Sequence, residues 1–136
     1  MNECRKNASA CTLTAETIYV FGGNSNSISL DSIEQYSITN NKWTKLKVRL
    51  PHPLSFMSCL KITDTSILIL GGSRKEVKPS SMTDQIQIGV QNKAQSTQNL
   101  LTTKSKHVYM LNLLEQKFTQ MQSLSKPFIS MYPPFL

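Results

Sequence analysis

The residues able to do chemistry are few in this chain and are scattered along it. Its two histidines, His52 and His107, have no acidic or cysteine neighbour at metal-ligand spacing. Ser123-Leu124-Ser125-Lys126 has the Ser-x-x-Lys spacing of acyl enzymes, but no companion motif accompanies it. The eight Asp and Glu residues form no visible acid–base pair, and no glycine-rich loop opens a helix to hold a phosphate. We therefore expect no catalytic, cofactor or metal site, and no enzymatic activity.

The three cysteines, Cys4, Cys11 and Cys59, cannot all pair with one another. No charged segment followed by an apolar one marks a secretory signal at the N-terminus. No apolar run approaches the length of a membrane span. We therefore expect a cytoplasmic protein with reduced thiols and no membrane span. Cys11 and Cys59 precede two similar glycine pairs, a place that favours packing over redox chemistry.

The net charge of +7 is concentrated in one segment. Residues 73–106 hold six Lys and Arg residues against two acidic ones. A basic segment can bind nucleic acid or an anionic membrane surface, but its composition is also typical of a solvated insertion. Few aromatic residues lie in it to stack on bases, so we do not expect a nucleic-acid partner.

An internal repeat organises the chain. Thr17 to Gly23 is a short apolar run that ends in two glycines, and Ser66 to Gly72 repeats it. An apolar segment and a polar turn precede each run, at residues 8–17 and 56–66, so each pair predicts a β-hairpin. Two adjacent glycines indicate a backbone that approaches a neighbour closely or adopts dihedrals that other residues avoid.

The second half of each unit repeats as well. Residues 32–38 and 43–46 alternate in polarity around an Asn-rich turn, and residues 108–113 and 118–121 match them when Trp43 is aligned with Phe118. A Leu-x-x-Pro segment follows each unit, at Leu50 and at Leu124. Four strands per unit predict an all-β fold built of propeller blades. The expected divisions are residues 1–50, residues 51–122 with the insertion at about 73–106, and residues 123–136 opening a third unit.

These residues resemble the kelch repeat, in which an apolar strand ends in a glycine pair and a Tyr and a Trp follow. The first unit has all of them, and the second is a degenerate copy with Leu111 and Phe118 at the aromatic places. The motif residues are Gly22, Gly23, Tyr36 and Trp43, then Gly71, Gly72 and Phe118. The resemblance implies blades packed face to face around an axis, structural glycines, and Trp43 and Phe118 packed between blades.

Two blades and the first strand of a third make an incomplete kelch-type propeller, because about 4–8 blades close a ring. Apolar blade faces would then lie uncovered and could self-associate. We favour a fragment of a larger propeller over a chain that closes its ring by oligomerising and over a gene remnant.

The resemblance implies a protein-interaction scaffold, of the adaptor or cytoskeletal type. It places residues 24–31, 73–106 and 47–52 on one shared face, where Arg49, His52, Arg74 and Lys75 would form a basic rim suited to an acidic peptide. One alternative is a fragment of a kelch-like enzyme whose active site lies in missing blades. Another is an insertion that binds nucleic acid or an anionic membrane surface.

Overall fold

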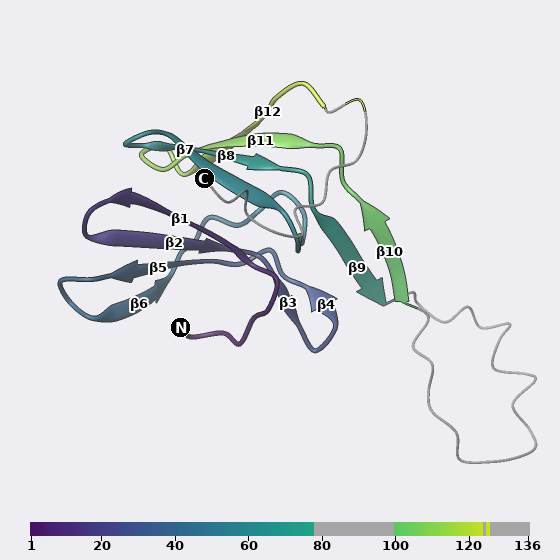
Figure 1. Cartoon of the computed structure of the whole chain (residues 1–136), viewed down its shortest axis with the longest axis horizontal. Coiled ribbons are helices and arrows are strands. Elements are labelled where there is room, and N and C mark those ends of the chain that lie inside the picture. Colours follow the sequence, from purple (N-terminus) through teal and green to yellow (C-terminus); the bar gives the residue numbers. More distant parts are fainter. Residues whose placement is uncertain (78–99, 124, 126–136) are drawn as a thin grey trace, which may run out of the picture.

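Two four-stranded antiparallel sheets face each other in the computed structural model of this chain (Figure 1). The structure describes residues 1–77, 100–123 and 125. The first sheet has the order β1-β2-β5-β6, with β1 Ser9–Thr14, β2 Thr17–Phe21, β5 Ile33–Ser37 and β6 Lys42–Lys45. The second has the order β12-β11-β8-β7, with β7 Ser58–Thr63, β8 Ser66–Leu70, β11 Val108–Asn112 and β12 Lys117–Gln120. All the described elements are strands, which confirms the all-β class.

The strand register agrees with the alignment of the two sequence units. Tyr36 is the strand partner of Trp43, and Leu111 is the partner of Phe118. The turn before each aromatic contains a residue with positive φ, Asn41 at 48° and Gln116 at 50°. The two sheets therefore repeat one another down to the conformation of a single turn residue.

Each glycine pair has the two properties that the sequence predicts. Gly22 and Gly23 have φ of +51° and +96°, and the second pair, Gly71 and Gly72, has +63° and +101°. A Cβ atom on Gly22 would collide with the carbonyl oxygen of Leu54, which belongs to the segment that joins the sheets. A side chain at this position would therefore push the two sheets apart.

The hydrophobic core lies between the two sheets. It comprises Leu13, Phe21 and Ile33 of the first sheet, Leu50, Leu54 and Met57 of the segment between β6 and β7, and Ile67, Ile69, Tyr109 and Leu111 of the second sheet. Because side chains alternate along a strand, each sheet also has a face turned away from this core. Burial of the core side chains holds the two sheets together.

The outer face of the second sheet is uncovered among the described residues. Leu60 and Ile62 of β7 are 53% and 51% exposed. They occupy the places that Cys11 and Leu13 have in β1, whose side chains pack into the core. The two sheets do not close into a ring, so the fold is that of an incomplete propeller.

The two ends of the expected insertion at about 73–106 form strands. Ser73–Val77 (β9) and Leu100–Lys104 (β10) pair as an antiparallel hairpin, with Val77 opposite Leu100. In the first sheet the same connection holds the short hairpin of β3 (Asn24–Ser25) and β4 (Ile28–Ser29). The insertion thus lengthens a hairpin that both units have. Residues 78–99, and nearly all of the expected third unit at 123–136, lie outside the described residues.

The two aromatic motif residues are placed differently. Phe118 packs against the core between the sheets. Trp43 lies on the opposite face of the first sheet, because its strand partner Tyr36 shares a face with Glu34, whereas the preceding residue Ile33 enters the core. There the ring of Trp43 is half-buried and lies 4.9 Å from the ring of Tyr36, centroid to centroid.

Candidate interaction face

Three connections form what we call the interaction face. The β3–β4 hairpin and the longer β9–β10 hairpin project from the same side of the two sheets (Figure 1). The third connection, residues 47–52, links the sheets and is bonded to the segment that follows β4. Loops carried by a rigid frame are the usual place for binding residues.

The β3–β4 hairpin is formed by a turn that the sequence analysis treated as a plain loop. Asn26 and Ser27 both have positive φ, 47° and 67°. Two successive residues with positive φ form the type I′ turn, whose twist matches that of the flanking strands. The sequence signal was Asn26, since Asn adopts the left-handed conformation more readily than most residues.

A cluster of three buried serines, Ser29, Ser55 and Ser73, joins the two hairpins. The Ser29 hydroxyl lies 3.4 Å from the Ser55 hydroxyl, which donates to the carbonyl oxygen of Ser73 at 3.1 Å. The backbone N–H of Lys75 in β9 donates to the Ser29 hydroxyl oxygen at 2.9 Å. Backbone bonds between Ser55 and Ser73, at 2.8 and 2.7 Å, complete the cluster. Because buried polar groups need partners, this serine cluster fixes β9 beside β4.

The connection between the sheets is held against the segment after β4. The Leu50 N–H donates to the Asp31 carbonyl oxygen at 2.8 Å, and the Leu54 N–H donates to that of Leu30 at 3.0 Å. Arg49 forms an ion pair with the Asp31 carboxylate at 2.7 Å, with 56% of its side chain exposed. The predicted rim residue Arg49 therefore lies on this face with its charge partly balanced by Asp31.

His52 lies at the end of the same connection and meets a second histidine. Its ring centroid is 6.0 Å from that of His107 and 6.3 Å from that of Tyr109. The His107 Nδ1 lies 3.2 Å from the Gln120 side-chain amide, and Tyr109 meets Phe118 edge to face at 6.3 Å. Burial raises the pKa of the Tyr109 hydroxyl. The two histidines are far apart in the sequence, and the fold brings them together where the connection between the sheets meets the residue before β11.

The other two predicted rim residues are consecutive in β9. Arg74 and Lys75 are half-buried where this strand leaves the second sheet. Two further basic residues, Lys104 at the end of β10 and Lys106 just after it, are exposed. The face thus gathers basic residues from β9, β10 and the connection, and the idea of a basic rim stays a prediction.

The first sheet has a buried ionic network that the sequence analysis did not anticipate. The Arg5 guanidinium, with a side chain 1% exposed, lies 2.8 Å from the fully buried Glu34 carboxylate. It also donates to the carbonyl oxygen of Gly22 at 2.7 Å and to the Ser32 hydroxyl at 3.0 Å. Glu3 completes the network at 3.1 Å from Arg5. The signal for it was Glu34, a charged residue next to the core residue Ile33 in β5.

Glu3 connects this buried network to solvent. Its carboxylate accepts a hydrogen bond from the Ser32 hydroxyl and lies 3.2 Å from the Lys45 ammonium. The hydrogen bond from Ser32 has the larger effect, and together with the bond from Lys45 it holds the pKa of the Glu3 carboxyl below its usual value. Residues 1–6 are therefore fastened along the first sheet by charge.

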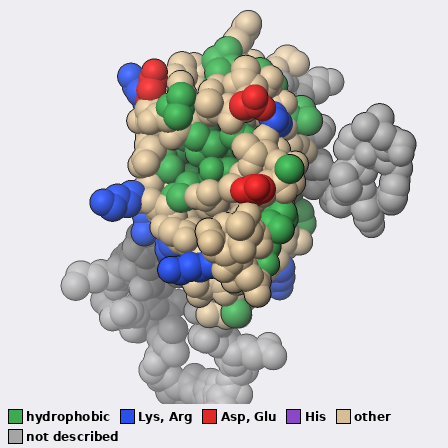
Figure 2. Space-filling view, turned by 90° about the vertical axis from the view of Figure 1, so that its left-hand side faces the viewer, with side chains coloured by type: hydrophobic (Ala, Val, Ile, Leu, Met, Phe, Trp, Pro, Cys, Tyr) green, Lys and Arg blue, Asp and Glu red, His purple; other side chains and the backbone are tan. Residues whose placement is uncertain are grey.

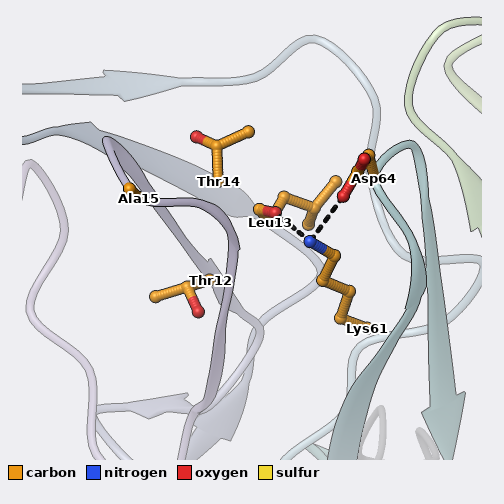
Figure 3. Close-up of a pocket in the computed structure, with 6 residues that line it drawn as sticks. All are labelled: Thr12, Leu13, Thr14, Ala15, Lys61 and Asp64. Carbon is orange, nitrogen blue, oxygen red and sulfur yellow. Dashed lines mark hydrogen bonds and ion pairs between the residues drawn. The ribbon is translucent and has the colours of Figure 1, made fainter.

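A hollow lies at the opposite end of the strands, beside the β1–β2 and β7–β8 turns. Figure 2 shows this side, with hydrophobic side chains gathered in the hollow. Lys61 spans it, donating to the carbonyl oxygen of Leu13 and lying 2.6 Å from the Asp64 carboxylate (Figure 3). The hydrogen bond from Lys61 lowers the pKa of Asp64. This ion pair lies within the β7–β8 turn and is exposed to water, and the hydrogen bond to Leu13 is the one that joins the two sheets here.

Within residues 1–77, 100–123 and 125, no three His, Cys, Asp or Glu side chains converge in a way that would hold a metal ion. The same part of the chain includes no helix with the length and apolarity needed to cross a membrane.

The kelch motif matches residues 4–47 of this chain as a family model. The match contains the first glycine pair, Tyr36 and Trp43, and covers the whole first sheet together with Arg5 and Glu34 of its ionic network. No curated protein matches the chain significantly in sequence.

Proposed function

We propose that this kelch-repeat chain is a non-enzymatic, cytoplasmic protein-binding scaffold whose interaction face takes an acidic peptide segment of its partner. Kelch repeats generally mediate protein interactions, which supports the class of function. The observation that carries the proposal is the convergence of the two hairpins and the connection on one side, joined by the serine cluster (Figure 1).

Charge supports an acidic ligand. Arg49 is exposed and pairs with Asp31, and the backbone of Lys75 is bonded to the serine cluster. A charge-assisted hydrogen bond contributes about 1.5–3 kcal/mol when its partner is bound. Two such bonds from a half-buried rim would give an affinity useful for an adaptor.

The test measures binding of fluorescent acidic and neutral peptides from a display library by anisotropy at physiological salt. Lys75→Glu should weaken the binding of selected acidic peptides by about 10-fold or more, in line with the loss of one charge-assisted contact. Lys42→Glu makes the same change of charge at the turn on the far end of the first sheet, and should leave binding unchanged. Equal weakening by both variants would show unspecific attraction and contradict a defined site.

We further propose that more blades cover the outer face of the second sheet in the working protein, supplied by a longer polypeptide or by another copy. Leu60, Ile62 and Met121 support this, since they are large apolar side chains exposed on one sheet. The chain as given should self-associate in sizing chromatography, and Leu60→Lys with Ile62→Thr should return it to a monomer. A wild-type chain that stays monomeric at high concentration would argue against it.

A further inference from the structure

Two cysteine side chains meet between the sheets. Cys11 lies in the middle of β1 and Cys59 lies near the start of β7. These are the strands at which the two sheets come closest along one edge, and both cysteines pack against the core while remaining partly accessible.

Contacts on both sides of Cys11 fix its position relative to β7. The Ser9 hydroxyl, two residues before Cys11, donates to the Cys59 sulfur at 3.0 Å. Leu13, two residues after it, accepts a hydrogen bond from Lys61, the next residue after Cys59 on the same face of β7. Since alternate residues of a strand share a face, Cys11 lies between these contacts and opposite Cys59.

Interaction between the two thiols moves their pKa values in opposite directions. The bond from Cys11, helped by that from Ser9, lowers the pKa of Cys59 against the effect of burial. The same bond and burial raise the pKa of Cys11. Cys59 is therefore the residue of the pair that ionises first, and the thiolate is the nucleophilic form of cysteine.

We propose that Cys11 and Cys59 form a reversible redox pair, which hydroperoxides oxidise to a disulfide that joins β1 to β7. The Cys59 thiolate attacks one oxygen of the hydroperoxide, forming a sulfur–oxygen bond and releasing hydroxide or alkoxide. The Cys11 sulfur then attacks the Cys59 sulfenic acid, forming the S–S bond. It releases water as the Cys11 proton leaves with the hydroxyl group. Two thiols are oxidised and one peroxide is reduced, and a dithiol reductant reverses the change.

The disulfide would change the mechanics of the chain. The sheets are held by the core, by the connecting segment and by a few bonds between β1 and β7. A covalent bond between these strands prevents the sheets from separating, so the interaction face would keep its shape even where the core loosens. Oxidation would then stabilise the binding-competent arrangement, and reduction would release it.

The experiment uses the whole chain with Cys4→Ser, so that the exposed third thiol takes no part. Limiting hydrogen peroxide is added, remaining thiols are alkylated under denaturing conditions, and peptides are mapped by mass spectrometry. We expect a cross-linked peptide pair containing Cys11 and Cys59 that dithiothreitol removes. A chain unfolded in guanidinium before peroxide is added should form this pair much more slowly, because the contacts of Ser9 and Lys61 are gone.

Two variants separate the roles of the cysteines. Cys11→Ser should leave Cys59 as a sulfenic acid that dimedone traps, whereas Cys59→Ser should leave Cys11 largely unlabelled. Ser9→Ala removes a donor to Cys59 without touching either cysteine, and should slow the disulfide several-fold while the folded spectrum is unchanged. The proposal fails if folded Cys4→Ser protein forms no Cys11–Cys59 bond. It also fails if Cys11 is the residue that dimedone labels first.

Discussion

The two sheets have side chains of opposite chemistry at one set of matched positions. Each sheet packs against the segment that precedes it in the chain. In the first sheet a charged network forms this contact, and in the second sheet aromatic and apolar side chains form it. The register aligns Glu3, Arg5, Ser32, Glu34 and Lys45 of the first sheet with His52, Leu54, His107, Tyr109 and Gln120 of the second. The side chains at these five positions differ in chemical type, while the backbone around them is the same.

The backbone bonds show that the alignment is structural. The Gly22 N–H donates to Ser32 at 3.0 Å and the Gly71 N–H donates to His107 at 3.1 Å, through the same carbonyl position. Asn7 and Phe56, with φ of 57° and 56°, match in the preceding segment. A buried site of this kind is therefore stable when all its members are charged and paired, or when its centre is apolar. A site that combined charged members with apolar ones would leave a buried charge without an opposite charge beside it.

The largest effect is expected from breaking the ionic centre. Arg5→Ala leaves the Glu34 carboxylate buried without its cationic partner, and should lower the free energy of unfolding by about 3–5 kcal/mol in urea titrations. The double variant Arg5→Leu with Glu34→Tyr copies Leu54 and Tyr109 of the second sheet, and should recover most of that loss. Lys45→Ala, which removes an exposed partner of Glu3, should cost about 1 kcal/mol or less.

The stability of the double variant decides whether this prediction holds. If the double variant is as unstable as Arg5→Ala, the two sheets do not offer interchangeable sites, and the ionic network is specific to the first sheet. Equal losses for Arg5→Ala and Lys45→Ala would mean that the buried pair adds little beyond an exposed one.

The second prediction compares the aromatic residues at matched positions. Phe118 is partly buried against the core and meets Tyr109, whereas Trp43 is partly buried outside the core and meets the Tyr36 ring. Phe118→Ala should cost about 3 kcal/mol and Trp43→Ala about 1 kcal/mol, although Trp is the larger residue. Thermal unfolding of both variants measures this. A greater loss for Trp43→Ala would mean that its face is covered in solution.

The third prediction concerns acid. The pKa of Glu3 is lowered in the folded chain, so its carboxylate stabilises the fold fully above the ordinary value of 4.5. That contribution disappears as the pH falls through the lower, folded pKa. Glu3→Gln should therefore lose less stability than the wild type when urea midpoints are followed from about pH 6 to pH 3. Parallel curves for the two proteins would exclude Glu3 as a source of acid sensitivity.

The smallest effect is expected at the far end of the strands. Asp64 pairs with Lys61 in the second sheet, where the first sheet has Ala15 in the equivalent turn. Since this pair is exposed, Asp64→Asn should leave the urea midpoint within experimental error. A measurable loss would mean that the β7–β8 turn depends on this ion pair.

The sequence was sufficient for the strands that carry strong local signals. Two glycine pairs, and Trp43 aligned with Phe118, predicted eight strands and their register, because period-two alternation and turn residues act over a few positions. The pairing of Arg5 with Glu34 and of His52 with His107 was not predictable this way. Each joins residues far apart in the chain, and their meeting depends on how the sheets are crossed and packed.

The hairpin strands were missed for a different reason. β3 and β4 have two residues each, too few for alternation to be seen. β9 is mostly polar, and what orders it near the sheet is the serine cluster, whose members come from three separate segments. For the interaction face, sequence reasoning located the connections but not the bonds that align them.

The pairing of Val77 with Leu100 has a consequence for engineering. It holds the two ends of the intervening segment about 5 Å apart, one strand spacing, whatever sequence lies between them. For a flexible loop closed at fixed ends, doubling the length costs only about 0.6 kcal/mol. Foreign peptides grafted after Val77 and before Leu100 should therefore be displayed beside the β3–β4 hairpin without disturbing the sheets, which makes this junction a natural cloning site for selecting new binders.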